Sequence, residues 1–289
     1  MQDKILNGKA LARIVEAEVS ARACELGREY GRLPKLVVIL VGDDPASSVY
    51  VRNKELSAER AGILHETIRM PKESSEADLL EAVGRLNADE SVDGILVQLP
   101  LPDGIDEDKV IEAISPDKDV DGFHPLSMGR LLAGLEGLAP CTPSGIMEIL
   151  KHYGIDVRGR RAVVVGRSNI VGKPAALMLL KADATVVCTH SRTKDLAAET
   201  KQADVLVVAA GRPNMIKKDM IKPGCVIIDV GIHKTENGLC GDVDPECYES
   251  AGFYTPVPGG VGPMTVACLI RNTLKAYELR NKRLQREHQ

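Results

Sequence analysis

The chain of 289 residues is poor in aromatic side chains, with six tyrosines, two phenylalanines and no tryptophan. Surfaces that bind RNA or single-stranded nucleic acid by base stacking need such side chains, so this shortage argues against them. The chain also lacks a large excess of charge of one sign, because 37 basic and 41 acidic residues leave a net charge of −4. That balance gives no basic patch for nucleic acid or a membrane surface. We expect neither as a partner, and an aliphatic core.

Paired cysteines and long apolar runs are also missing. Seven cysteines are scattered without a C-x-x-C pair, which disfavours a disulfide framework and a structural zinc site. Six histidines show no ligand spacing, so no metal is expected. No stretch reaches the roughly 18 apolar residues of a membrane span, and charges interrupt the N-terminal stretch where a signal peptide would be apolar. We therefore predict a cytoplasmic protein.

Strand and helix patterns alternate along the chain. Aliphatic runs predict buried parallel strands at 35–42, 161–166, 184–190, 203–211 and 224–231, with a shorter strand at 64–70. Residues 93–102 are expected to form a further strand that runs into a proline-stopped loop. Apolar residues at helical spacing predict helices around 11–19, at 48–62, 76–87, 145–154 and 171–182, and a closing helix at 265–283. This alternation is typical of an α/β protein with parallel sheets. The pattern indicates two α/β units with a seam around 115–145.

The segment GRSNIVGKP (166–174) lies between a predicted strand and a predicted helix. A small-residue turn at this place exposes backbone amides to a pyrophosphate, although Ser168 replaces the second glycine of the usual pattern and a tight turn alone would explain it. The next strand ends in Ser191 and Arg192 rather than in the acid that binds the ribose of NAD. Hydroxyls beside an arginine suit a 2′-phosphate, and Arg167 adds a second cation. A dinucleotide here is expected to be NADP.

Tyr50 and Lys54 share one face of a predicted helix. Short-chain dehydrogenases also carry Tyr-x-x-x-Lys, but after the nucleotide-binding strand, whereas this pair precedes it. A surface lysine beside a packed tyrosine would explain the pair; a lysine in a cleft, with a pKa lowered by burial, would exchange protons near neutral pH. Gln98 is either a solvated strand end or a ligand-facing amide at the carboxyl edge of the sheet.

The segment SPDKDVDGFHP (115–125) begins like a calcium loop. Its twelfth position holds Met128 in place of the bidentate glutamate, which excludes that interpretation. Two others stay open: a solvated acidic turn, or a carboxylate, Asp121, that accepts hydrogen bonds from a bound heterocycle. The apolar segment TPVPGGVGPMT (255–265) is expected to form a cleft wall where the backbone approaches a ligand.

Six motifs occur in one order along nearly the whole chain: YVRNK, QLPLP, DVDGFHPLSMGRL, CTPSGI, GRSNIVGKP and PVPGGVGPMT. Together they resemble the bacterial bifunctional methylenetetrahydrofolate dehydrogenase/methenyltetrahydrofolate cyclohydrolase family. The resemblance implies a homodimer with two α/β domains flanking a cleft. A catalytic folate-binding domain would comprise residues 1–140 and 265–289, and a Rossmann-like NADP-binding domain with a parallel sheet would comprise residues 141–264.

The resemblance also implies a function in one-carbon metabolism and purine supply. NADP would oxidise 5,10-methylenetetrahydrofolate to the methenyl form, which is then hydrolysed to 10-formyltetrahydrofolate. Lys54 would handle protons in the hydrolysis and Gln98 would tune it. Tyr50 would stack on the folate and Asp121 would hold its pterin ring. The implied folate contacts are Tyr50, Lys54, Gln98, Pro100, Asp121, Gly262 and Pro263, and the implied NADP contacts are Gly166, Arg167, Ser168, Ser191, Arg192 and Ile232.

Two other functions remain open. One is another two-domain NADP-dependent dehydrogenase of shikimate type, which the QLPLP and PGGVGP segments disfavour. The other is a noncatalytic NADP-binding sensor on the same fold. A sensor has no use for a set such as Tyr50, Lys54, Gln98 and Asp121, so this set favours an enzyme.

Overall fold

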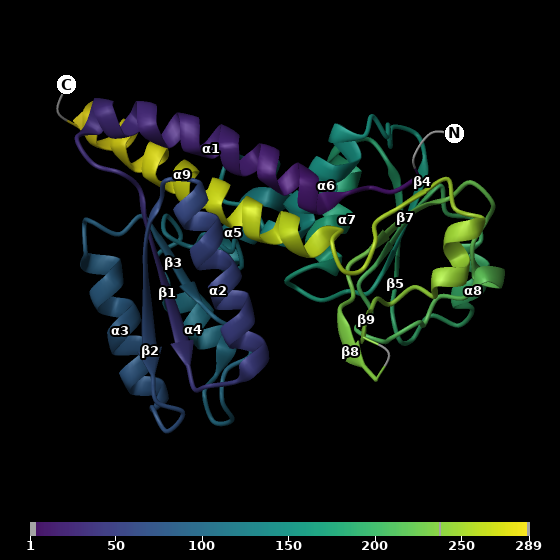
Figure 1. Cartoon of the computed structure of the whole chain (residues 1–289), viewed down its shortest axis with the longest axis horizontal. Helices are drawn as coiled ribbons and strands as arrows, with labels where there is room; N and C mark the ends of the chain where they lie inside the picture. The colour runs from purple at the N-terminus through teal and green to yellow at the C-terminus, as the bar shows by residue number, and fades with distance from the viewer. Residues whose placement is uncertain (1–3, 237, 288–289) are drawn as a thin grey trace. The chain divides into compact units, whose positions relative to one another are not determined.

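The structure is a computed structural model that describes residues 4–236 and 238–287. It divides into two compact units, shown in Figure 1. The three-strand unit comprises residues 13–141 and 266–287, and the five-strand unit comprises residues 4–12 and 142–265. The division falls within helices α1 (Gly8–Tyr30), α6 (Cys141–His152) and α9 (Val261–Glu287). Both units are α/β, as predicted.

The sheet of the three-strand unit has the order β2 (Leu64–Met70), β1 (Lys35–Val41), β3 (Gly94–Val97), with all pairs parallel. The first strand of the chain lies in the middle, so the strand order reverses at β1. Its residues after Lys35 are all buried, as a strand covered on both faces requires. Helices α2 (Pro45–Arg60) and α3 (Glu76–Ala88) connect its strands, and α4 (Glu107–Ala113) and α5 (Pro125–Leu132) follow β3.

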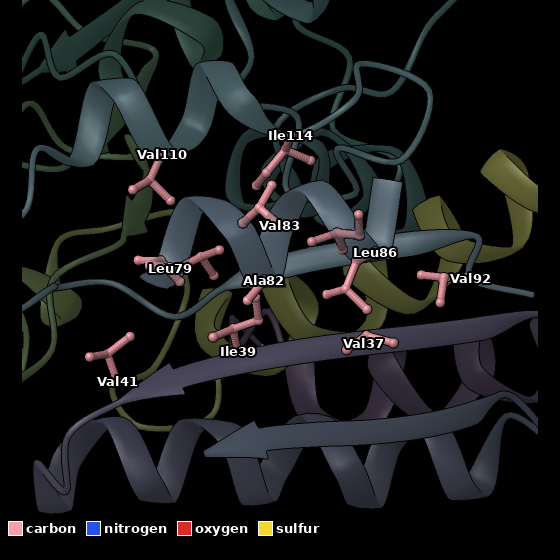
Figure 2. Packing of buried hydrophobic residues seen from close by; sticks show 12 residues of the cluster. Val37, Ile39, Val41, Leu79, Ala82, Val83, Leu86, Val92, Val110 and Ile114 are labelled. Atoms are coloured by element: carbon pink, nitrogen blue, oxygen red, sulfur yellow. The ribbon is translucent and has the colours of Figure 1, made fainter. Parts of the chain in front are cut away.

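Helix α3 shows how local signals and burial combine in this unit. Ser75 forms a capping box with Asp78 at its start, which satisfies two backbone amides. Leu79, Val83 and Leu86 then recur at helical spacing and pack against alternate residues of β1, as Figure 2 shows. Each such side chain contributes roughly 1.5–3 kcal/mol through burial. Truncation of Leu79 to alanine should cost about 2–5 kcal/mol of unfolding free energy.

The sheet of the five-strand unit is entirely parallel. Its order is β10 (Phe253–Tyr254), β7 (Val226–Asp229), β6 (Val205–Val208), β4 (Arg161–Val165), β5 (Thr185–Thr189). The order reverses at β4, between β5 and β6. Helices α7 (Gly172–Lys181) and α8 (Leu196–Thr200) connect its first strands, and a hairpin of β8 (His233–Thr235) and β9 (Gly238–Cys240) follows β7. Short 3₁₀ helices cover Lys218–Met220 and Pro245–Glu249.

Residues 4–12 differ from the predicted boundary, because they belong to the five-strand unit and not to the other. Leu6 N donates to Tyr254 O at 2.8 Å and Tyr254 N donates to Lys4 O at 2.9 Å. This short parallel pairing beside β10 ties the segment to the sheet. Long-range pairing of this kind leaves no local signal in the sequence.

The strand predicted to run into a proline-stopped loop within 93–102 ends at Val97, since Pro100 and Pro102 have no N–H to continue a ladder. The predicted start of the closing helix was wrong. The closing helix begins at Val261 rather than 265. Gly262 and Pro263 therefore lie in the first turn of α9, where proline is tolerated because the first-turn amides need no helical partner. Among the described helices, none has the length and apolar character needed to cross a membrane.

Candidate active site

Lys54 lies on the buried side of α2. Asp44 caps this helix by accepting from Ser47 N at 2.7 Å, and Pro45 occupies the first turn. Lys54 is only 9% exposed, whereas Tyr50, one turn earlier, is 42% exposed. The four-residue spacing thus places an exposed ring next to a buried amine on the same side of the helix.

The Lys54 amine donates a hydrogen bond to Oε1 of Gln98 at 2.8 Å. Gln98 directly follows β3, and its backbone amide donates to Ile39 O of β1 at 2.8 Å. The pair is therefore held at the carboxyl edge of the sheet, where the strand order reverses and where open α/β sheets bind ligands. Nε2 of Gln98 donates to Leu99 O at 2.6 Å, which turns Oε1 toward the lysine. A neutral acceptor binds the amine without holding it as an ammonium, as a carboxylate would.

Burial changes the protonation of this site. It lowers the pKa of Lys54, because a buried ammonium loses its hydration, while the negative charge of Asp121 opposes the shift. Burial also raises the pKa of Asp121 to about 6, and the Lys54 ammonium offsets part of that rise. Each pKa is moved toward neutral pH, which is the property needed for proton exchange under physiological conditions.

The turn that carries Asp121 is built around a second carboxylate, Asp119. This side chain is buried and accepts from Gly122 N at 3.1 Å, His124 N at 2.8 Å and Ser127 Oγ at 3.0 Å. These bonds close the turn, so Asp119 is a structural residue and the segment is more than a solvated acidic loop. Within residues 4–236 and 238–287, no three His, Cys, Asp or Glu side chains are grouped to hold a metal ion.

A second candidate site lies at the carboxyl end of β4 in the five-strand unit. Gly166 has a φ of +117°, and a Cβ there would lie 2.1 Å from Ala209 O; a Cβ on Gly172 would lie 2.3 Å from Gly166 O. Both positions require glycine. Ser168 Oγ accepts from the amides of Val171 and Gly172 at 3.2 Å each. The result is a backbone-lined turn at the start of α7 that fits a pyrophosphate.

The neighbouring strand β5 supplies the residues that would distinguish NADP from NAD. Ser191 and Arg192 follow this strand and are exposed, as is Arg167 beside β4. Arg192 N donates to Nδ1 of His190 at 3.1 Å, which orders the turn. The turn after β5 thus offers a hydroxyl and a guanidinium in place of a carboxylate, and this set fits a 2′-phosphate better than free ribose hydroxyls.

Ile232 and the start of α9 meet within the five-strand unit. A Cβ on Gly262 would lie 3.2 Å from Cδ1 of Ile232, and Pro263 follows in the same helical turn. The family resemblance implied that Ile232 contacts the nicotinamide and that Gly262 contacts the folate. These two residues are neighbours in the fold, although they are 30 positions apart along the chain.

The structure places the remaining candidates as follows. Lys54, Gln98 and Asp121 are brought together in the three-strand unit, with Tyr50 one helical turn away. Pro100 is exposed, two residues beyond Gln98, after a cis peptide bond. Gly166, Arg167 and Ser168 occupy one turn of the five-strand unit, and Ser191 and Arg192 occupy the turn after the adjacent strand.

Sequence reasoning missed three groups of potential importance. The Cys141 thiol is buried, donates to Val120 O at 3.2 Å and has a pKa raised well above its usual value by burial. Asp229 and Asp242 are also buried and accept several backbone amides. The sequence offered one signal: Asp229 ends the apolar run CVIID, and Asp242 lies in the short segment GDVD. Nothing in the local sequence showed that these two aspartates lie together in the fold.

A glycine turn for a dinucleotide in one unit and a buried lysine–glutamine pair in the other define a two-domain, nucleotide-dependent α/β enzyme. Comparison with known proteins narrows this class. Residues 6–121 match the model of the tetrahydrofolate dehydrogenase/cyclohydrolase catalytic domain, and residues 140–281 match the NAD(P)-binding domain of the same family. The chain belongs to the tetrahydrofolate dehydrogenase/cyclohydrolase family.

Individual relatives agree with this assignment. The bifunctional protein FolD of Paracidovorax citrulli is 56% identical over 280 residues, which cover 96% of this chain and 99% of that protein. The crystal structure of FolD from Campylobacter jejuni has a TM-score of 0.93 and 48% identity, covering 96% and 99% of the two chains. The Trypanosoma brucei enzyme, solved with NADP and an inhibitor, has a TM-score of 0.91 and 37% identity, covering 96% and 97%.

These findings confirm the predicted family, the two-domain α/β fold and the bifunctional dehydrogenase/cyclohydrolase activity. They also confirm the prediction of NADP, through the NAD(P)-binding domain and the NADP complex of a relative. The shikimate-type alternative is not favoured: shikimate 5-dehydrogenase of Thermus thermophilus reaches a TM-score of 0.52 at 16% identity, which shows a shared fold alone.

Proposed function

We propose that the Lys54–Gln98 pair carries the cyclohydrolase chemistry and that the Gly166 turn holds NADP for the dehydrogenase step. The observation that carries this proposal is the 2.8 Å bond between a buried lysine amine and a neutral amide oxygen. The substrates would be 5,10-methylenetetrahydrofolate and the methenyl cation formed from it. The product would be 10-formyltetrahydrofolate, a one-carbon donor of the kind that purine synthesis uses.

The dehydrogenase step needs orientation more than acid–base catalysis. Bound NADP would supply an acceptor for the hydride that leaves the methylene carbon. The resulting positive charge is shared by the two flanking nitrogens, so no proton leaves the reacting carbon and no base is required. The protein would then contribute by holding the two partners in reacting geometry. Gly166, Gly172 and Ser168 would position the pyrophosphate, with Ser191, Arg192 and Arg167 around the 2′-phosphate and Ile232 at the nicotinamide.

The hydrolysis step does need a group that moves protons. Water adds to the methenyl carbon and loses a proton, and the neutral amine of Lys54 would accept it. The bond from this carbon to N5 then breaks, N5 gains a proton, and the formyl group remains on N10, with one proton released overall. Burial lowers the pKa of Lys54, which favours the neutral amine that this step needs. Gln98 would hold the amine in place.

The other residues of the three-strand unit would bind the folate. Asp121 would accept hydrogen bonds from the pterin ring, and the exposed ring of Tyr50 would stack on the flat part of the substrate. Pro100 would form a further apolar contact. Gly262 and Pro263, to which the family resemblance also assigns folate contacts, lie in the first turn of α9 in the five-strand unit. These roles follow the family resemblance, and the charge of Asp121 acting on Lys54 supports the place given to Asp121.

We further propose a homodimer in the cytoplasm. The homodimer follows from the family resemblance, and size-exclusion chromatography with light scattering tests it: a mass near 31 kDa in place of twice that value would refute it. Cytoplasmic location is supported by the seven cysteines, all of which are free thiols.

The experiment that tests the function uses two assays on the purified protein. Methylenetetrahydrofolate with NADP should yield NADPH, followed by its absorbance, and methenyltetrahydrofolate alone should be hydrolysed faster than in buffer. Absence of NADPH formation would remove the dehydrogenase assignment. Hydrolysis at the buffer rate would remove the cyclohydrolase assignment.

A further inference from the structure

Asp242 forms a fully buried acceptor centre within the five-strand unit, outside the residues assigned so far. Its side chain has no exposed area. Oδ2 accepts from Ala210 N at 2.6 Å and Gly211 N at 3.0 Å, and Oδ1 accepts from Arg212 N at 2.8 Å. Oδ1 also lies 2.7 Å from Nε2 of His233. One carboxylate therefore joins the loop after β6 to the first residue of β8.

A second carboxylate supports the first. Asp229 ends β7, and its oxygens accept from Gly231 N at 3.1 Å, Asp242 N at 3.0 Å and Val243 N at 3.0 Å. The packing leaves no room for a side chain at the adjoining glycine, because a Cβ on Gly231 would lie 2.4 Å from Oδ1 of Asp242. The two buried aspartates thus form one rigid network, in which each acceptor is satisfied by backbone donors.

This network holds Ile232 from both sides. The preceding residue, Gly231, is bound through its amide to Asp229, and the following residue, His233, is bound through its ring to Asp242. The Ile232 side chain itself is 38% exposed. Its backbone is therefore fixed while its side chain remains available to a ligand.

The same network also holds the loop at 210–212, which adjoins the Gly166 turn. The loop bound by Asp242 begins directly after Ala209, whose carbonyl would lie 2.1 Å from a Cβ on Gly166. Ala209 N donates to Val165 O of β4 at 2.8 Å. A shift of the 210–212 loop would therefore displace the Gly166 turn, which is proposed to bind the pyrophosphate. A shift of His233 would displace Ile232.

We propose that His233 and Asp242 are positioning residues of the dehydrogenase reaction: they fix Ile232 and the 210–212 loop, and through them the nicotinamide, in the orientation that hydride transfer requires. This inference rests on the proposed NADP site. Neither residue takes part in hydrolysis, which belongs to Lys54 in the other unit. Loss of the His233–Asp242 contact should therefore affect one activity and spare the other.

The test is the variant His233→Leu, which removes the ring donor while Oδ1 of Asp242 keeps its bond from Arg212 N. Misplacement of reacting groups by about 1 Å can cost on the order of 100-fold in rate, so we expect dehydrogenase kcat to fall about 10- to 100-fold. Cyclohydrolase kcat, measured without NADP, should stay within about twofold. The primary deuterium isotope effect with substrate labelled at the methylene carbon should rise, because hydride transfer becomes slower relative to binding and release.

Two further variants separate positioning from general damage. His233→Gln carries an amide nitrogen at about the reach of Nε2 and should restore most of the dehydrogenase activity. His233→Asn, which is too short to reach Asp242, should resemble His233→Leu and serves if the leucine variant does not fold. His152→Leu, at an exposed position of the same unit, is the matched control and should leave both activities unchanged.

Each outcome decides the proposal. A parallel fall in both activities, or an unchanged isotope effect in His233→Leu and His233→Asn, would overturn it. Equal loss in His233→Gln and His233→Leu would show that the hydrogen bond is not the cause. Failure of the proposed function itself looks different, because wild-type protein would then lack NADP-dependent oxidation altogether.

Discussion

In the three-strand unit the strand order reverses at β1, in the five-strand unit it reverses at β4, and in each unit a candidate site lies at the carboxyl edge beside that strand. The first site uses ionisable side chains whose pKa values are shifted by burial: Lys54, which is buried, and Asp121, which is partly buried. The second uses glycine backbone at Gly166 and Gly172 with exposed cations nearby. The difference matches the two reactions: hydrolysis requires proton transfer, and hydride transfer requires placement.

Asp121 in the three-strand unit and Asp229 in the five-strand unit show the same difference between single side chains. Burial raises the pKa of Asp121 to about 6 and that of Asp229 to about 6. Asp229 accepts from three backbone amides, whereas the influences that favour the ionised form of Asp121 come from Lys54 and the Cys141 thiol. A raised pKa alone therefore does not identify a reactive carboxylate. The identity of its hydrogen-bond donors separates a structural acceptor from a group that can serve a substrate.

The largest effect should follow loss of the proton-transfer group. Lys54→Met removes the amine and keeps most of the apolar length, so cyclohydrolase kcat should fall about 10²- to 10⁴-fold, the usual contribution of a positioned acid–base group. Hydrolysis of methenyltetrahydrofolate measures it. Lys151→Met, at an exposed lysine of α6, is the control. Near wild-type turnover in Lys54→Met would show that Lys54 does not transfer the proton. It would also refute the assignment of proton transfer to the three-strand unit.

The next effect concerns the glycine turn. Gly166→Ala places a Cβ against Ala209 O at a φ of +117°, so the turn must deform and NADP binding should weaken. Strain of this kind costs about 1–3 kcal/mol, or roughly 5- to 150-fold in dehydrogenase kcat/KM for NADP. Cyclohydrolase activity should change by less than about twofold, because the Gly166 turn and the Lys54 site lie in different units and are expected to act independently.

Gly159→Ala is the matched control for that variant. Gly159 also has a positive φ, of +69°, but a Cβ there meets nothing within 4 Å. It should lose some stability without a change in the KM for NADP. Equal KM changes in the two variants would show that backbone strain in general, and not the Gly166 turn, governs binding.

A smaller effect is expected at the 2′-phosphate. Arg192→Ser should lower kcat/KM for NADP about 10- to 100-fold, the value of a charged hydrogen bond of about 1.5–3 kcal/mol, and should leave kcat/KM for NAD nearly unchanged. Steady-state kinetics with both nucleotides measures the ratio, with the exposed Arg158→Ser as control. Equal losses with NADP and NAD would assign Arg192 to general binding and not to the phosphate.

The smallest effect is the pH dependence of stability. The pKa of Asp121 is raised to about 6 from its ordinary 3.8, so the folded state binds the proton more tightly than the unfolded state. The stabilisation from protonated Asp121 is full below about pH 4 and is lost as pH rises through about 6. Relative to Asp121→Asn, the wild type should lose about 2 kcal/mol of unfolding free energy between pH 4 and pH 7.

Urea unfolding at both pH values measures this difference. Asp229→Asn is a second comparison. Because burial also raises the pKa of Asp229 to about 6, this variant should likewise flatten the pH slope, and it should in addition lower stability at both pH values, because backbone amides lose an acceptor oxygen. Identical pH slopes for wild type and Asp121→Asn would mean that the Asp121 carboxyl group is not perturbed.

Much of the fold could be predicted because its signals are local. The buried strands at β1, β4, β6 and β7 read as continuous aliphatic runs, and α3 has its cap and apolar spacing within a dozen residues. The elements that were missed are all short: α4, α5, α8, β10, the β8–β9 hairpin and the two 3₁₀ helices. Short elements have weak periodicity and are stabilised by the segments they pack on, so the sequence pattern alone does not define them.

The candidate site divides in the same way. The alternation of strands and helices, the small-residue turn at 166–172 and the residue types at 50, 54, 98 and 121 are properties of the sequence. The six motifs in one order, which include these residues, were sufficient for the family and its two reactions. The tertiary structure decided which atom of the Gln98 amide faces Lys54, how deeply that amine is buried, and how Asp229 and Asp242 hold the backbone on either side of Ile232. The physical reason is that pKa, burial and hydrogen-bond partnership depend on groups distant along the chain, which approach only when the sheet has formed.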